Sequence, residues 1–241
     1  MRRTLILVDV QNGFLHNADN QVMVQKIHQL LNEQLFDRVI ATRYVNTAGS
    51  NIIRLMGWDK LLTAAEQTIP PEILEHVDYV DEKIGYSGYT ETMRKFLLQD
   101  NGDKYPEEIF LAGLDLGCCV LETATDFFEA GVRPFVLTAY CSCAGGQAYF
   151  DAALLCLEHL IGAQYLIPDE TIQTKEQLER VIRQAQQTKP CYLRKKGSFS
   201  AAFFLPCVRE RIGPGGNFQV IAGDVGVDLG GVQVVVSQHL L

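Results

Sequence analysis

The stretch EEIFLAGLDLGCCVLETATDFFEAG (residues 107–131) decides the fold. Its first seven residues form a short apolar run of the kind found in buried strands. After it, apolar residues recur with the spacing of one helix face, at Val120, Ala124, Phe127 and Phe128. We therefore predict a buried strand that passes directly into a helix, with Cys118 and Cys119 in the turn between them.

Cysteines at the start of a helix have a distinctive electrostatic setting. Free backbone N–H groups and the positive end of the helix dipole meet there and favour negative charge. A thiol in this position can become a thiolate, which is the nucleophilic form. The alternative is that Cys118 and Cys119 are small buried residues, because free cysteine is commonly buried.

The alternation of strand and helix extends over most of the chain. Further apolar runs lie at 4–10, 37–43, 133–139 and 163–168. Helical patterns lie near 20–35, 90–99, 147–160 and 174–187. This order predicts an α/β fold, a Rossmann-like parallel sheet of about five or six strands sandwiched by helices. Asp9, at the end of the first strand, and the double cysteine would then lie on the same rim of the sheet.

Composition divides the chain near residue 188. Residues 1–187 carry the alternating pattern and form the predicted α/β domain. Residues 188–241 are rich in glycine and show no helical pattern. We expect them to form an irregular C-terminal extension of unknown role, with weak strands or disorder.

The formal net charge of −8 argues against nucleic acid or an anionic membrane as a partner. No apolar run reaches the roughly 18 residues of a membrane span. The first run stops at Asp9 without a cleavage site, which favours a strand over a signal peptide.

Seven cysteines without paired C-x-x-C spacing favour reduced thiols in a cytoplasmic protein and argue against a zinc site. The five histidines show no paired spacing either, so we interpret them as structural or solvated: His16, His28, His76, His159 and His239.

Three stretches carry a family resemblance: LILVDVQNGFL (5–15), EKIGYSGY (82–89) and GLDLGCCV (113–120). They resemble, in order, a strand ending in D-x-Q-N-x-F, a K-x-x-x-S-x-F/Y segment and a G-x-x-T-x-x-C-V turn. These motifs are typical of the isochorismatase-like cysteine hydrolases, which include nicotinamidases and other small-amide hydrolases. The resemblance runs from about residue 3 to residue 187. The segment after it has no recognised counterpart in the family.

The resemblance implies a catalytic triad that cleaves a small amide through a thioester. Cys119 would be the nucleophile, Asp9 the acid and base, and Lys83 their electrostatic partner. A cis peptide between Leu114 and Asp115 would turn the amides of Asp115 and Cys119 toward the oxyanion. No cofactor is needed for this chemistry, and a homo-oligomer acting on a small molecule is expected. Candidate residues for the substrate pocket are Phe14, Tyr86 and Tyr89.

The chain departs from the family at three points. Nicotinamidases bind a metal through a segment resembling D-x-H-x-x-x-H, but residues 42–61 contain no histidine, so no metal is expected. Leu116 replaces the usual threonine of the turn, and Asp115 adds a carboxylate that we expect to point outward. Two alternatives stay open: a vinyl-ether hydrolase of the isochorismatase type, although its members lack the cysteine, and a catalytically silent binding or assembly module.

Overall fold

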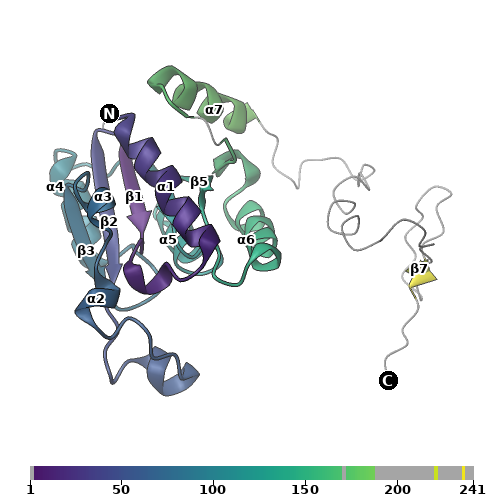
Figure 1. Ribbon diagram of the computed structural model, residues 1–241. Coiled ribbons are helices and arrows are strands. Elements are labelled where there is room, and N and C mark those ends of the chain that lie inside the picture. Colours follow the sequence, from purple (N-terminus) through teal and green to yellow (C-terminus); the bar gives the residue numbers. More distant parts are fainter. Residues whose placement is uncertain (1–2, 170–171, 188–219, 222–234, 237–241) are drawn as a thin grey trace. The chain divides into compact units, whose positions relative to one another are not determined.

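The structure is a computed structural model that describes residues 3–169, 172–187, 220–221 and 235–236 (Figure 1). The chain divides into two units, residues 1–194 and residues 195–241. The strands of the first unit are β1 (Thr4–Val8), β2 (Arg38–Tyr44), β3 (Tyr79–Lys83), β4 (Glu108–Gly113), β5 (Arg133–Cys141) and β6 (Leu166–Ile167). Its α-helices are α1 (Ala18–Asn32), α2 (Ala64–Gln67), α3 (Pro71–Leu74), α4 (Glu91–Asp100), α5 (Cys119–Glu129), α6 (Gln147–Leu160) and α7 (Lys175–Gln187).

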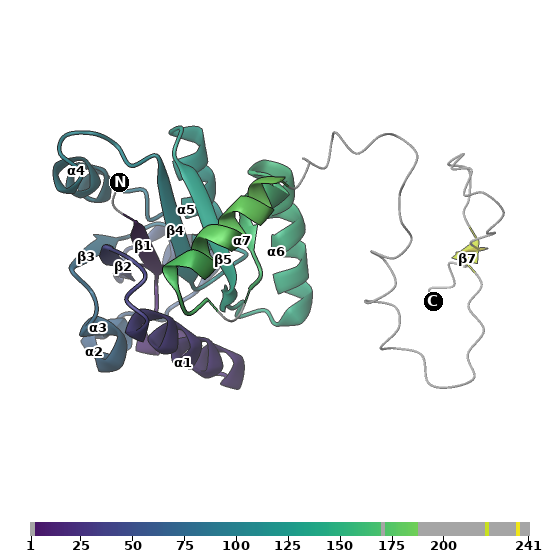
Figure 2. The ribbon, with the colours of Figure 1, turned by 90° about the horizontal axis from the view of Figure 1, so that it is seen from above.

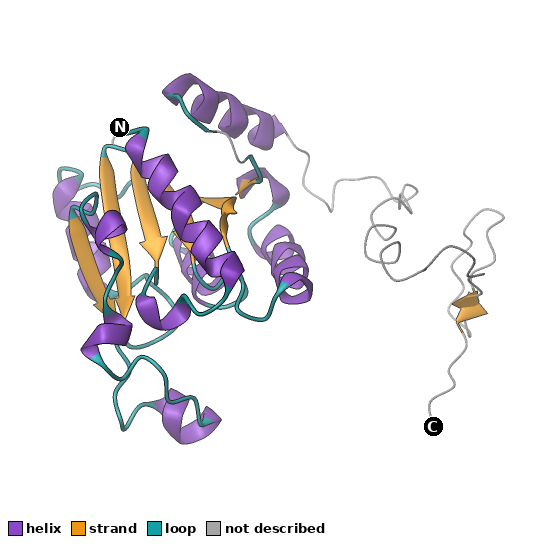
Figure 3. Cartoon of the chain, viewed as in Figure 1, coloured by secondary structure: helices purple, strands orange, loops and turns teal. Residues whose placement is uncertain are grey.

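The six strands form one sheet in the order β3-β2-β1-β4-β5-β6, and every neighbouring pair is parallel. Helices cover both faces, as the two views in Figures 2 and 3 show. Side chains of α1, α3 and α7 pack on one face and those of α4, α5 and α6 on the other. The predicted three-layer α/β fold is confirmed.

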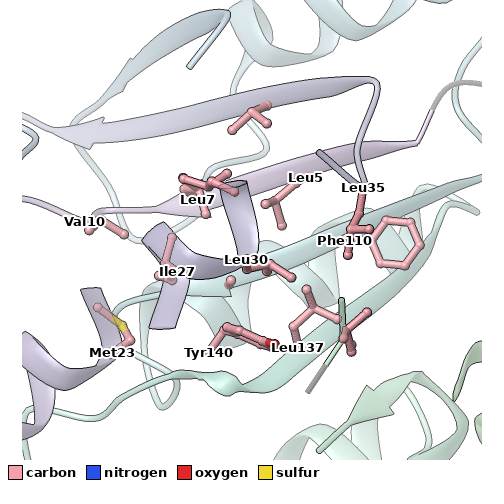
Figure 4. Close-up of a cluster of buried hydrophobic side chains, with 14 of the residues drawn as sticks. Leu5, Leu7, Val10, Met23, Ile27, Leu30, Leu35, Phe110, Leu137 and Tyr140 are labelled. Atoms are coloured by element: carbon pink, nitrogen blue, oxygen red, sulfur yellow. The ribbon is translucent and has the colours of Figure 1, made fainter. Parts of the chain in front are cut away.

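The central strands β1 and β4 are buried on both faces, and their residues alternate between two cores. Leu5 and Leu7 of β1 belong to the core under α1, whereas Ile6 and Val8 belong to the core under α5. All four are 0% exposed. Figure 4 shows the first of these cores, where Ile27 of α1 lies against the sheet. This double burial explains why the strands appear in the sequence as continuous apolar runs.

Gly113 lets the end of β4 lie directly against β1. Its φ angle is +120°, and a Cβ atom at this position would lie 2.3 Å from the carbonyl oxygen of Val8. Only glycine tolerates both conditions. The first glycine of the turn is therefore required by close packing of the two central strands.

Two predictions need correction or restriction. The sequence pattern did not indicate β3, because this edge strand reads YVDEK and is partly exposed and polar. In the predicted extension, the structure describes only β7 (Val220–Ile221) and β8 (Val235–Val236), which pair antiparallel. The rest of the prediction for 188–241 lies outside the described residues. No helix in the described part of the chain is long and apolar enough to cross a membrane.

Candidate active site

The three predicted catalytic residues come from three strand ends on one rim of the sheet. Asp9 directly follows β1, Lys83 is the last residue of β3, and Cys119 is the first residue of α5, just after β4. The chain order reverses on the two sides of β1, which lies between β2 and β4. In open α/β sheets, ligands bind at such a reversal, beyond the carboxyl ends of the strands.

Asp9 and Lys83 form a buried ion pair. The distance from Lys83 Nζ to Asp9 Oδ2 is 2.7 Å, and the two side chains are 1% and 0% exposed. The ammonium also donates to the carbonyl oxygens of Gly85 at 2.9 Å and Tyr86 at 2.7 Å. The other carboxylate oxygen, Asp9 Oδ1, accepts a hydrogen bond from Thr42 Oγ1 at 2.6 Å. These contacts hold the ion pair in place at the end of the sheet.

The Cys119 thiol interacts electrostatically with both members of this pair, and the residue is 7% exposed. Burial raises the pKa of the Cys119 thiol well above its ordinary value, the charge of Asp9 raises it further, and Lys83 opposes the change only in part. Burial and the Asp9 carboxylate therefore both favour the neutral thiol over the thiolate.

Lys83 keeps its charge in this buried position. Burial lowers the pKa of the Lys83 ammonium, but its interactions with Asp9 and with Cys119 raise it by more, so the pKa lies above its ordinary value. Lys83 is therefore a buried cation between a carboxylate and a thiol.

The turn after β4 presents two free backbone amides. The neighbouring amides all donate hydrogen bonds: Leu116 to Ser142 O, Gly117 to Asp115 Oδ1, and Cys118 and Val120 to Asp115 O. Within the described ranges, no acceptor lies in hydrogen-bonding geometry to the amides of Asp115 and Cys119. The Leu114–Asp115 peptide bond is cis, as the resemblance implied. Two free donors beside a thiol are an arrangement that can stabilise an oxyanion.

The Asp115 carboxylate, at the edge of the cavity, organises the turn through hydrogen bonds. Its Oδ1 accepts from the Gly117 amide at 2.7 Å and from Cys143 Sγ at 2.9 Å, and its Oδ2 accepts from the Ala144 amide at 2.7 Å. Leu116, which replaces the threonine of the family motif, is 0% exposed and belongs to the core. A carboxylate thus supplies the contacts that steady the turn.

Cys119 lies at a cavity of about 190 Å³ with mostly apolar walls. The rings of Phe14 and Trp58 stack with centroids 6.0 Å apart and an interplanar angle of 18°. Tyr44 and Tyr86 also line the cavity, as does the exposed thiol of Cys118. Cys118 and Cys119 therefore line the same cavity, the first exposed and the second buried.

Two of the three residues predicted to line the substrate pocket do so in the structure. Phe14 and Tyr86 line the cavity, but Tyr89 does not. Instead, the Tyr89 ring packs edge-on against Phe127 at 4.7 Å in the core under α5. The sequence reasoning missed Trp58 and also Thr42, the partner of Asp9. The one feature of the sequence that could have drawn attention to Trp58 is that it is the single tryptophan of the chain. Nothing in the sequence pointed to Thr42.

The region after β2 does not fit the metal site of nicotinamidases. Asn46 is 3% exposed, and its side chain is fully occupied by protein partners. Its Nδ2 donates to Lys60 O at 2.8 Å and Trp58 O at 3.5 Å, and its Oδ1 accepts from Ser50 Oγ at 2.6 Å. The Asn46 side chain therefore serves to close the loop through hydrogen bonds. Residues 42–61 also contain no histidine that could act as a metal ligand.

Comparisons with known proteins agree with this geometry. The isochorismatase domain model matches residues 3–163. Among solved structures, the N-carbamoylsarcosine amidase from Thermoplasma acidophilum has 22% identity and a TM-score of 0.58, with 72% of this chain and 100% of that chain covered. The nicotinamidase from Bacillus subtilis has 20% identity and a TM-score of 0.55, with coverages of 67% and 97%.

An isochorismatase-like hydrolase from Alkaliphilus metalliredigens has 15% identity and a TM-score of 0.58, with coverages of 66% and 92%. A search of curated protein sequences gave no match. The structural likenesses show a shared fold, and the domain match covers most of the chain. The chain belongs to the isochorismatase family of hydrolases.

Proposed function

We propose that the protein is a cysteine hydrolase that cleaves the C–N bond of a small amide through a thioester on Cys119, without a metal. One observation carries the proposal. A buried thiol contacts an acid–lysine pair and adjoins two free backbone amides at an apolar cavity. A silent binding module would have no need of this combination, and a vinyl-ether hydrolase would have no need of the thiol.

The proposed reaction starts from the neutral thiol. Asp9 takes the proton as the sulfur attacks the amide carbon, and the amides of Asp115 and Cys119 donate to the oxyanion. Each such donor contributes roughly 2.7–4 kcal/mol. Asp9 then returns the proton to the leaving nitrogen as the C–N bond breaks. A water deprotonated by Asp9 attacks the thioester, which releases the carboxylic acid, and the proton on Asp9 returns to the Cys119 sulfur.

The cavity favours a small uncharged substrate with a flat group. Its volume of about 190 Å³ holds a ring or a short chain, and Phe14 and Trp58 offer their faces. Among the described lining residues the only charged side chain is Asp115, which is committed to the turn. Lys83 is buried and is held by Asp9 and by two carbonyl oxygens. We therefore expect the cavity to offer no cation to a substrate carboxylate.

A screen of small amides, ureas and imides for ammonia release tests the proposal. We expect turnover of an uncharged compound, and a mass increase on Cys119 when the reaction is quenched early. A matched anionic compound should react far more slowly. If no compound is turned over but several bind in the cavity, the silent binding module is correct.

The pH dependence of alkylation tests the protonation state of Cys119. A thiol with a raised pKa reacts slowly at pH 7.5, and its rate should keep rising with pH beyond the ordinary thiol range near ~8.5. Asp9→Asn removes the carboxylate that raises this pKa, so we expect iodoacetamide to label Cys119 several-fold faster at pH 7.5 while hydrolysis falls. Mapping the adducts by mass spectrometry separates Cys119 from Cys118. A wild-type rate already constant above pH 7 would show a resting thiolate and contradict this assignment.

Asn46→Ala should weaken substrate binding more than chemistry. The variant removes the hydrogen bonds that hold Trp58 and Lys60, so the loop that carries Trp58 loosens. We expect KM to rise about tenfold and kcat to change less than about threefold, because the catalytic groups lie on other strand ends. Asn51→Ala is the matched control, since Asn51 is exposed and its side chain contacts only Arg54 of the same loop. Equal effects of the two variants would contradict the role of Asn46.

We also propose that the enzyme works in the cytoplasm as a homo-oligomer. Reduced cysteines support the first point, because five are free in the described ranges. Exposed apolar side chains support the second: Leu55, Met56 and Ile84 are 69%, 68% and 78% exposed, and Met56 also lines the cavity. Light scattering on the purified chain should give a mass above that of one chain.

A further inference from the structure

Two histidines far apart in the sequence meet beside a carboxylate, away from the cavity. His28 lies on α1, and Glu75 and His76 directly follow α3. Glu75 Oε1 lies 3.9 Å from His28 Nε2 and 3.6 Å from His76 Nε2. The two imidazole rings are tilted by 55° with centroids 5.7 Å apart. None of the three residues lines the cavity at Cys119.

The cluster stands on a rigid support. Ile27 and Ile73, the neighbours of the cluster on α1 and α3, are both 0% exposed and share one hydrophobic core. The amide of Glu75 donates to Pro71 O at 3.0 Å and that of His76 to Ile73 O at 3.1 Å. The three side chains therefore project from backbone that packing and hydrogen bonds hold in place.

The two imidazole nitrogens and the carboxylate oxygen lie close together, but the nitrogens form no hydrogen bond with the carboxylate. All three lie within 4.8 Å of one another, yet both nitrogens are too far from the carboxylate oxygen for a hydrogen bond. His76 Nε2 is buried and has no hydrogen-bond partner in the described part of the chain. An orphaned imidazole nitrogen aimed at a second imidazole and a carboxylate matches the ligand set of a metal ion better than that of an ion pair.

We propose that His28, Glu75 and His76 bind a divalent transition-metal ion, Zn²⁺ by the character of the donors. Zinc binds imidazole nitrogen and carboxylate oxygen at about 2.0–2.2 Å, so tetrahedral ligands stand about 3.4 Å apart. The separations of 3.6 Å and 3.9 Å from Glu75 exceed this by about 0.2 Å and 0.5 Å. Glu75 is 64% exposed and can shift by that amount, and its exposure leaves room for a water as fourth ligand.

The ion would join α1 to α3 and would play no part in the reaction at Cys119. This site differs from the aspartate–histidine segment after β2, which the chain lacks. Metal binding would also replace the interpretation of His28 and His76 as structural or solvated residues. That interpretation considered spacing along the chain, whereas the two residues meet only when α3 folds against α1.

Calorimetric titration of the tag-free full chain with Zn²⁺ tests the site, with a parallel titration by Co²⁺ followed by absorption. We expect one ion to bind with micromolar affinity and to raise the melting temperature by several degrees, reversibly on chelation. His76→Ala and Glu75→Gln should each weaken binding roughly tenfold or more. Because Glu75 is exposed, its variant keeps the fold. His159→Ala, a change on α6, is the matched control and should bind as the wild type does.

Three results would overturn the proposal. One is the absence of binding at millimolar zinc, and another is unchanged affinity in the His76 and Glu75 variants. The third is a thiolate charge-transfer band in the Co²⁺ spectrum, which would place the ion on cysteines such as Cys118. Melting temperature and affinity are measured without substrate, so the outcome is independent of the proposed hydrolysis.

Discussion

Cys119→Ala should lower kcat for amide hydrolysis by about 10⁴-fold or more, with a small change in substrate affinity. The variant removes the atom that forms the thioester, and no neighbouring group can replace it. Cys118 lies on the cavity wall, but Asp9 and Lys83 are not among the groups that shift its pKa. The fold should persist, because one sulfur atom at a cavity wall is lost.

The measurement is steady-state ammonia release combined with intact-mass detection of the acyl-enzyme. Cys118→Ala is the matched control, and we expect its kcat to stay within about threefold of wild type. If Cys118→Ala were inactive and Cys119→Ala active, the nucleophile would have been assigned to the wrong cysteine. Activity in both variants would rule out a thioester.

Lys83→Met should cost about 3–5 kcal/mol of unfolding free energy and more than about 10²-fold in kcat. The stability falls because the Asp9 carboxylate stays buried without its counter-ion, and its side chain is 0% exposed. Activity falls for a separate reason. Without the cation, nothing offsets the effects of burial and of Asp9 on the Cys119 thiol, so its proton becomes harder to remove.

The double variant Asp9→Asn/Lys83→Met separates the two effects. With both charges removed, much of the lost stability should return, because no uncompensated ion remains in the core. Activity should not return, since the base is gone. Urea unfolding and kcat on the same samples measure both. Lys95→Met is the control, because this exposed lysine pairs only with Glu91 on the helix surface and should change neither quantity appreciably.

A double variant as unstable as Lys83→Met alone would show that Lys83 stabilises the fold through its contacts with the carbonyl oxygens of Gly85 and Tyr86. A fully active Lys83→Met would remove the lysine from the proposed mechanism and leave Asp9 and Cys119 as a dyad.

Sequence alone was sufficient for the features that depend on neighbouring residues. The apolar run at 107–113 and the helical spacing after it predicted β4 and α5, because burial on both faces of a strand and on one face of a helix leaves a periodic pattern. The same reasoning located Asp9 at the end of β1. The order of the three motifs then indicated Lys83. The strand that carries it, β3, is too polar to appear in the sequence as an apolar run.

Only the tertiary structure decided the features that depend on distance across the sheet. Thr42 reaches Asp9 because β2 pairs with β1, and Trp58 reaches Phe14 because Asn46 closes a loop. The protonation state of Cys119 depends on how deeply it is buried and on which charges surround it, so a motif cannot give it. Local periodicity fixes where strands and helices form. Side-chain contacts and pKa values follow from packing between segments that the sequence keeps far apart.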